Sequence, residues 1–216
     1  MQPVTAGPDT IQMSETPRQL LPREERRAQI LQAAARAFAD GGYAATSMED
    51  VAAAAGVTKL IVYRHFESKE ELYGAILDSV STRLKAEWTA AMALPLPQRR
   101  GGTVRALLRV AREDPDGYRL LIFHAPRESQ FEKQAFGYWE EAVAGVDELL
   151  GPHVREPAVR PWVVPSVMGF LLHSVLLWLD AGKPSDDEVF VEQATAGLHA
   201  MVSTWTDLTE VEERPG

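Results

Sequence analysis

The chain contains no cysteine, so neither a disulfide framework nor a zinc site built on thiolates can form. It also lacks the signals of β-structure. No segment sustains an alternation of apolar and polar residues, and no two-residue hairpin turn joins two such runs. Of the 216 residues, 45% are hydrophobic, which is enough to bury a sizeable core. These features together predict an all-α protein.

The signatures of the common enzyme classes are also missing. No nucleophile elbow and no phosphate-binding glycine loop occurs, and carboxylate runs such as Glu140-Glu141 are typical of solvated helix faces. The histidines lack the HExxH spacing of a zinc protease; they are His65, His124, His153, His173 and His199. The sequence therefore indicates no catalytic residue, no metal site and no cofactor.

An excess of positive charge, which would favour nucleic acid, is absent from the chain as a whole. The net charge is −9, but it is unevenly distributed. From Arg18 to Lys69 there are eight Lys or Arg residues and six Asp or Glu residues, a net charge of +2. From Glu70 onward there are fourteen Lys or Arg residues and twenty-three Asp or Glu residues, a net charge of −9. A mildly basic head on an acidic body would orient that head toward a polyanion.

Both ends of the chain have tail-like compositions. Residues 1–20 have neither a basic start nor an apolar central segment, so we expect a disordered tail rather than a secretory signal. Residues 207–216 are acidic and predict a second tail. The absence of cysteine agrees with a cytoplasmic location.

Between these tails, helical signals dominate. A helix from Arg23 ends at Asp40-Gly41-Gly42, and Thr46 with Glu49 predicts a capping box for a short helix, Ser47–Ala54. A third short helix follows Gly56, and Ser68 with Glu71 opens a long helix toward Leu94. After a Pro/Gly linker at 95–102 we expect helices over 103–112, 115–124, 128–150, 162–179 and 186–205.

The second and third short helices meet the demands of a helix-turn-helix. Ala52 is small enough for a close crossing, and Gly56, four positions on, allows the positive φ that the turn needs. Val62 can bury itself against the first of the two helices. We therefore expect a three-helix head at 21–68 and a helical body at 69–206.

The run TSMEDVAAAAGVTKLIVYRHFESKEELYGAIL closely resembles the DNA-binding head of TetR-type regulators. The resemblance implies that Thr58–His65 is a recognition helix inserted in the major groove of double-stranded DNA. It implies phosphate contacts by Tyr63, His65 and Lys69, and also by Thr46 and Ser47. It implies base contacts by Thr58, Lys59, Leu60 and Ile61, where many relatives carry Gly and Thr in place of Leu60 and Ile61.

The uncharged stretch 161–179 is long enough for a membrane span, but Pro165, His173 and the absence of flanking basic clusters argue against one. A helix buried by its own subunit and by a second one has the same composition. In the family the last two helices commonly dimerise, which implies a homodimer spaced for a palindromic operator. The expected interface residues are Phe170, Leu177, Trp178, Phe190, Ala194, Gly197, Leu198, Met201 and Trp205.

Between head and interface, the resemblance implies a chamber for a small hydrophobic effector. The candidate lining residues are Trp88, Leu108, Tyr118, Phe123, His124, Phe131, Phe136, Trp139, Met168 and His173, for each of which plain core packing is the alternative.

The resulting hypothesis is a repressor that a ligand releases from its operator by moving the long helix. The alternatives are a ligand-requiring repressor, an activator, and a helical enzyme with a DNA-binding head. The sequence names neither the operator nor the effector.

Overall fold

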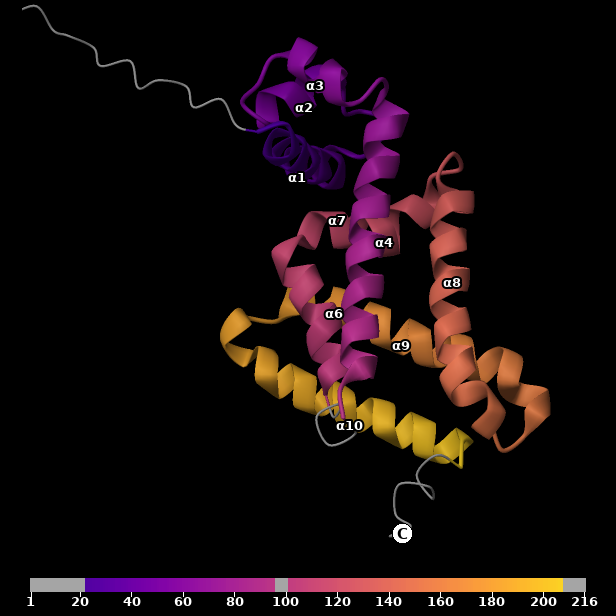
Figure 1. Ribbon diagram of the computed structural model, residues 1–216. Helices are drawn as coiled ribbons and strands as arrows, with labels where there is room; N and C mark the ends of the chain where they lie inside the picture. Colours follow the sequence, from indigo (N-terminus) through magenta and orange to yellow (C-terminus); the bar gives the residue numbers. More distant parts are fainter. Residues whose placement is uncertain (1–21, 96–100, 208–216) are drawn as a thin grey trace, which may run out of the picture.

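The computed structural model describes residues 22–95 and 101–207. Within these ranges helices are joined by loops and turns, and the only β-pairing is one isolated bridge between Val154 and Thr206 (Figure 1). The all-α prediction is confirmed. The tail expected at 1–20, all but Asp207 of the tail expected at 207–216, and most of the expected linker lie outside the described residues.

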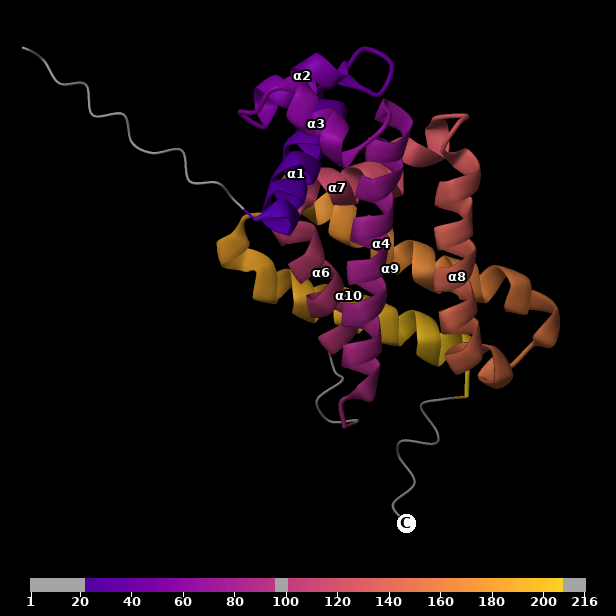
Figure 2. The same ribbon diagram turned by 45° about the horizontal axis from the view of Figure 1, so that its top comes forward.

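The head consists of α1 (Arg23–Gly41), α2 (Met48–Ala54) and α3 (Lys59–His65), which form the top of the molecule in Figures 1 and 2. Two glycines make its turns: Gly42 after α1 has φ 76°, and Gly56 between α2 and α3 has φ 63°. Side chains larger than glycine rarely adopt such angles, so these two positions determine where the first two helices end.

The cap of α2 lies one residue later than the sequence suggested. Ser47, not Thr46, is the N-cap, and its hydroxyl accepts a hydrogen bond from the Asp50 amide at 3.2 Å. The Asp50 carboxylate in turn accepts one from the Ser47 amide at 2.9 Å. The expected box of Thr46 with Glu49 is therefore wrong, because Thr46 turns its hydroxyl into the protein instead. At α4 the expected cap is present, since Ser68 accepts from the Glu71 amide at 3.0 Å.

The long helix α4 (Lys69–Ala93) descends from the head into the body, where it packs beside α6 (Gly102–Glu113) and α8 (Glu132–Leu150). Between α6 and α8, the chain forms α7 (Pro115–Arg119), a π-helical stretch (Leu120–His124) and a 3-10 turn (Ala125–Arg127). Because of this irregular segment, α8 begins four residues later than the sequence predicted.

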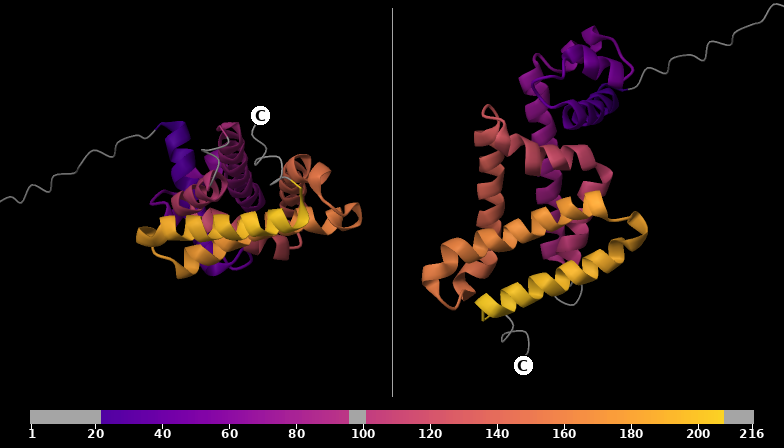
Figure 3. Two further views of the ribbon diagram at one scale, coloured as in Figure 1. Left: turned by 90° about the horizontal axis from the view of Figure 1, so that it is seen from below. Right: turned by 180° about the vertical axis from the view of Figure 1, so that it is seen from behind.

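The last two helices, α9 (Arg160–Ala181) and α10 (Asp187–Trp205), lie side by side at the end of the body remote from the head (Figure 3). By length and composition, the helical segment Pro157–Ala181 could cross a membrane, but half of its most apolar window is buried inside the protein. Such burial is typical of a core helix. Trp178 of α9 stacks on Phe190 of α10 with ring centroids 5.0 Å apart.

One hydrophobic core runs from head to body. Ile30, Phe38 and Val62 are fully buried in the head, and Leu72 and Ile76 of α4 continue the same cluster into the body. Since apolar side chains of α1, α3 and α4 share this core, the head is packed on α4 and is not an independently tethered domain.

Candidate nucleic-acid interface and effector pocket

Helix α3 turns one face inward and the other to solvent. Val62 is fully buried against the head, and Ile61 is half-buried against the same core. On the outer face, Leu60 is 63% and Tyr63 is 43% exposed. Large apolar and aromatic side chains held out in water on a short helix are unusual unless they meet a partner. Of the residues expected to read bases, Thr58, Lys59 and Leu60 are exposed, and Ile61 is only partly available.

Lys59 does not extend freely into solvent. Its ammonium forms an ion pair with Glu49 of α2 and lies 5.6 Å from the centre of the Tyr63 ring. The hydrogen bond with Glu49 raises the pKa of Lys59, and the same bond lowers the pKa of Glu49. A guanine or phosphate that binds the Lys59 ammonium must therefore displace the Glu49 carboxylate, which would itself face the DNA.

Thr46 and Ser47, the two residues expected to contact phosphate at the start of α2, have different surroundings. Thr46 is buried, and its hydroxyl donates to the Gly42 carbonyl at 2.8 Å and the Ala37 carbonyl at 3.1 Å. This geometry does not fit a phosphate contact by the Thr46 hydroxyl. Ser47, the true N-cap, is half-buried at the start of α2, where its hydroxyl is shared with Asp50.

Lys69 bridges the loop between α1 and α2. Its ammonium donates to the carbonyl oxygens of Tyr43 at 2.9 Å and Thr46 at 3.1 Å, and it lies 4.3 Å from the centre of the Tyr43 ring. An ammonium has three N–H donors, so one remains for a phosphate. Lys69 thus organises the loop that precedes α2 as well as carrying a charge at the head.

His65 closes α3 next to the start of α1. Its Nδ1 is buried without a hydrogen-bond partner among the described residues. Burial, followed by the charges of Arg23 and Arg27, lowers the pKa of the imidazole below its ordinary value. Neither arginine was predicted as a contact residue. The one sequence signal that could have pointed to them is the run REERR at residues 23–27, which contains both. With the exposed Arg64 they add positive charge at this end of the recognition helix.

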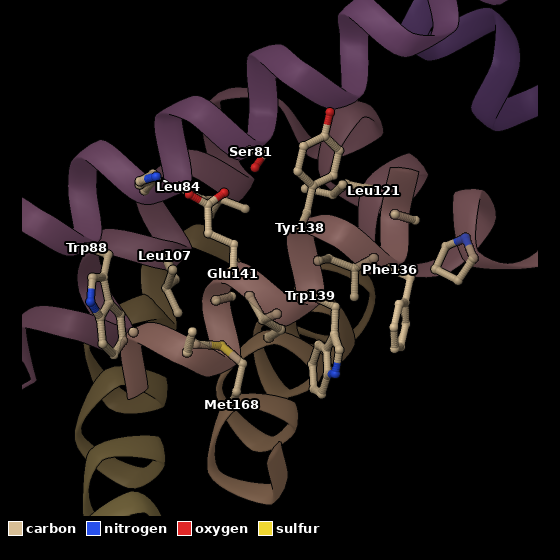
Figure 4. Close-up of a pocket in the computed structure, with 18 of the residues that line it drawn as sticks. Ser81, Leu84, Trp88, Leu107, Leu121, Phe136, Tyr138, Trp139, Glu141 and Met168 are labelled. Carbon is tan, nitrogen blue, oxygen red and sulfur yellow. Dashed lines mark hydrogen bonds and ion pairs between the residues drawn. The ribbon is translucent and has the colours of Figure 1, made fainter. Parts of the chain in front are cut away.

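The body contains a cavity of about 860 Å³ between α4 and α8, bounded below by α9 (Figure 4). Figure 4 shows Trp88, Glu141 and Met168 around it, on α4, α8 and α9 respectively. Its walls are mostly apolar, with a few polar groups, as binding sites for small organic molecules usually are.

Half of the predicted lining residues border this cavity: Trp88, Phe136, Trp139, Met168 and His173. The others lie elsewhere. Leu108 is buried in the core while its neighbour Leu107 faces the cavity, because one residue along a helix turns the side chain by about 100°. The Tyr118 hydroxyl donates to the Leu172 carbonyl at 2.9 Å inside the core.

The π-helical stretch and the turn after it account for the remaining differences. In this register Leu121 and Ile122 face the cavity, whereas Phe123 is 45% exposed with the Arg127 guanidinium 3.9 Å from its ring centre. His124 lies outside the lining as well, and Phe131 packs toward the head. A π-turn rotates the side chains that follow it, a shift that periodicity read from sequence does not reveal.

Polar contacts tie α8 to α4 around the cavity. The Tyr138 hydroxyl donates to Asp78, and Lys85 forms an ion pair with Glu141. The Gln134 amide donates to the Tyr138 hydroxyl at 2.8 Å. Sequence reasoning missed these residues, since each is an ordinary surface residue of an amphipathic helix until the two helices meet.

Comparison with known proteins identifies the family. Residues 30–76 match the family model of the bacterial regulatory proteins of the tetR family. The chain is 32% identical over 176 residues to the HTH-type transcriptional activator FasR of Mycolicibacterium smegmatis, covering 80% of each protein. The chain belongs to the tetR family. This TetR-family regulator is also 37% identical over 160 residues to the HTH-type transcriptional repressor Rv3405c of Mycobacterium tuberculosis, covering 62% of this chain and 85% of that protein.

Solved structures have the same fold. A TetR-like transcriptional regulator from Rhodococcus sp. RHA1 superposes with a TM-score of 0.68 at 19% identity, over 85% of this chain and 96% of that one. AibR, solved in complex with isovaleryl coenzyme A and operator DNA, superposes with a TM-score of 0.59 at 24% identity, over 84% of this chain and 98% of that one. The solved structures show the shared fold, whereas the family match and the similarity to FasR and Rv3405c show that the protein is a sequence-specific DNA-binding transcriptional regulator.

Most residues expected at a dimer interface of this TetR-family regulator contact their own protomer. An ideal Cβ built on Gly197 would lie 3.2 Å from the Phe170 ring, so α9 and α10 approach closely at this point. Ala194 is buried, and Leu198, Met201 and Trp205 pack against the core. Leu177 is different, since 68% of it is exposed. Trp162 on α9 and Val189 on α10 are also more than half exposed.

Proposed function

We propose that this TetR-family regulator binds a palindromic operator as a homodimer, in the cytoplasm and without catalysis, and that a small apolar effector in the α4–α8 cavity changes its affinity for that operator. The exposed face of α3 supports the proposal most strongly: Leu60, Tyr63 and Lys59 project from a helix whose other face is locked into the head. In a helix-turn-helix this is the face that enters the major groove.

The exposed apolar residues of α9 and α10 support a dimer. Leu177, Trp162 and Val189 lie on the two helices farthest from the head, and water-exposed apolar side chains at such a position are best covered by a second copy. Two recognition helices held about 34 Å apart can then enter successive major grooves on one face of the duplex.

The direction of regulation has two candidates. We favour a repressor that the effector releases, as one similar protein is named a repressor. An activator is the second candidate, favoured by the similar protein named a transcriptional activator. Transcription in vitro from a promoter that carries the selected operator separates them, since the protein lowers the transcript yield in the first case and raises it in the second.

The experiment that tests DNA recognition is selection of bound duplexes from a random pool, followed by titration of the enriched duplex at two salt concentrations. We expect an enriched palindrome, with affinity that falls steeply with salt as phosphate contacts displace counterions. Tyr63→Ala and Lys69→Ala should each weaken binding. If no sequence is enriched and the two variants bind as well as the parent, specific recognition by α3 is excluded.

A further inference from the structure

Four aromatic rings meet where the head joins the body. Phe38 is in the last turn of α1, Tyr43 lies in the loop that follows, and Tyr73 is in the second turn of α4. The fourth ring, Phe131, comes from the body, directly before α8. Its ring is stacked on Tyr73 at 4.2 Å and meets Tyr43 edge-on at 5.0 Å, measured between ring centroids.

Packing holds the rings of Phe131 and Tyr73. Phe131 is 5%, Tyr43 7% and Tyr73 0% exposed. The Tyr73 hydroxyl is buried with no hydrogen-bond partner among the described residues, so no polar contact anchors that ring. Close-packed aromatic contacts are short-ranged, so a shift of Phe131 must be followed by Tyr43 and Tyr73 or leave a void.

Tyr43 also contacts Lys69. The Lys69 ammonium lies 4.3 Å from the Tyr43 ring centre and donates to the Tyr43 and Thr46 carbonyl oxygens. Thr46 directly precedes Ser47, the N-cap of α2. The ring of Tyr43 therefore contacts both Phe131 of the body and Lys69, which holds the loop before the helix-turn-helix.

Phe131 is also rigidly attached to the wall of the cavity. Its carbonyl oxygen accepts a hydrogen bond from the Ala135 amide at 2.8 Å in the first turn of α8. Ala135 lines the cavity, as does Trp139 one turn further on. Figures 1 and 2 show α8 standing beside α4 with its first turn directed toward the head. A displacement of α8 by a bound molecule thus reaches Phe131 through one helical turn.

We propose that Phe131 is a positioning residue that transmits occupancy of the cavity to Lys69, with α8 acting as a second lever beside α4. This rests on the proposed function, because it assumes that the cavity takes an effector. The relay runs from the wall of the cavity through Phe131 and Tyr43 to Lys69. An effector that displaces α8 loosens the rings around Tyr43 and so weakens DNA binding through Lys69 and α2.

The test uses the full chain, the selected duplex and N-phenyl-1-naphthylamine, a neutral apolar dye. Energy transfer from Trp88 and Trp139 reports dye binding, and anisotropy of labelled duplex reports DNA binding. Each affinity is measured with and without the other ligand. Reciprocity requires that the dye change DNA affinity by the same factor as DNA changes dye affinity, and this factor is the coupling.

In the parent protein we expect a coupling of about 10-fold, within the usual range for allosteric pairs. Phe131→Ala should bind the dye with unchanged affinity, because Phe131 does not line the cavity. It should bind the duplex about 3- to 10-fold more weakly, since Tyr43 loses the ring that packs on it, and it should reduce the coupling toward one. Phe131→Leu keeps apolar volume without the ring, so it should fold. Its duplex affinity and its coupling should lie between those of the parent protein and those of Phe131→Ala.

The matched control is Val146→Ala, because Val146 is buried on the same helix but lies outside the cavity lining and far along the chain from Phe131. It should lower the melting temperature while leaving duplex affinity and coupling as in the parent. Full coupling in Phe131→Ala and Phe131→Leu would overturn the relay while leaving the proposed function intact. A parent protein that binds both dye and duplex without coupling would overturn both.

Discussion

Lys69 and Tyr43 are joined twice, since the lysine ammonium donates to the tyrosine backbone carbonyl at 2.9 Å and lies 4.3 Å from the centre of its ring. The family resemblance predicted a phosphate contact for Lys69, and the structure adds a structural bond to the same side chain. A residue with both roles affects DNA binding in two separable ways: through its charge and through the loop that it holds.

Replacing Lys69 by methionine should therefore weaken operator binding by about 10-fold or more and reduce the salt slope of log K by about one, as expected for one lost phosphate contact. The measurement is a titration of the selected duplex at several salt concentrations. Arg64→Met, at an exposed cation on α3, provides the comparison. An unchanged salt slope in Lys69→Met, with affinity still reduced, would show that the lysine acts only on the loop.

Glu49→Gln should strengthen DNA binding. The carboxylate of Glu49 pairs with Lys59 at the face of α3 and would repel approaching phosphates, so its removal frees one cation and deletes one anion. We expect the affinities for the selected duplex and for a random duplex both to rise by about 2- to 5-fold at low salt, and less at high salt. Glu113→Gln, which breaks a comparable ion pair with Arg83 in the body, should change neither affinity.

His65 predicts a dependence of DNA binding on pH. Burial, with Arg23 and Arg27, holds its pKa below the ordinary value of 6.5, so the imidazole is neutral in the free protein at neutral pH. A bound phosphate favours the protonated form, so binding takes up a proton and operator affinity should rise as the pH falls from about 7.5 to about 5.5. His65→Asn should remove this dependence.

The lowered pKa of His65 affects folding stability in the direction opposite to its effect on DNA affinity: the protein becomes less stable as the pH falls. An unfolded chain, with an ordinary histidine pKa, binds the proton before the folded chain does, so the free energy of unfolding falls as the pH falls through about 6.5. The pKa of His124 is also lowered, mainly by burial, so part of this loss should persist in His65→Asn. Denaturant unfolding at several pH values measures both contributions; a rise in stability at low pH would contradict the assignment.

Filling the cavity should separate effector binding from DNA binding. Ala142 lines the cavity on α8, and Ala142→Trp should reduce binding of the apolar dye at least 10-fold by occupying part of its about 860 Å³. Because this tryptophan fills space that is already open and leaves α8 and Phe131 where they are in the free protein, operator affinity should stay within about 2-fold of the parent. Ala86→Trp, at an exposed position of α4 outside the lining, is the control for a surface tryptophan.

Leu177→Glu should convert the dimer to monomer. Leu177 is 68% exposed on α9, and a carboxylate in a buried apolar interface is strongly unfavourable because it loses its hydration. Sedimentation measures the mass, and titration of the palindromic duplex should show at least a 10-fold loss of affinity, as two half-sites no longer bind together. Asp180→Asn, at an exposed residue on the same helix, should stay dimeric. A dimeric Leu177→Glu would place the interface elsewhere.

Most helix positions and the exposed side of α3 were predictable because their causes are local. Positive φ at Gly42 and Gly56, the cap at Ser68 and the spacing of apolar residues all act within a few neighbours along the chain. One local error, the cap of α2, arose because Thr46 and Ser47 are both residue types that cap helices. A contact from Thr46 to the end of α1 decided between them.

The cavity and the junction of head and body were decided by tertiary structure. Nothing in the sequence distinguishes Phe131, which packs on Tyr73, from Phe136, which faces the cavity, since both are aromatics of one amphipathic segment. The π-turn before α8 and the packing of α8 on α4 decide which of the two side chains packs on Tyr73 and which faces the cavity. The sequence by itself determined most helix positions and which side of α3 faces solvent, because these follow from neighbouring residues. Which aromatic side chains meet depended on how distant helices pack, and only the three-dimensional fold establishes that.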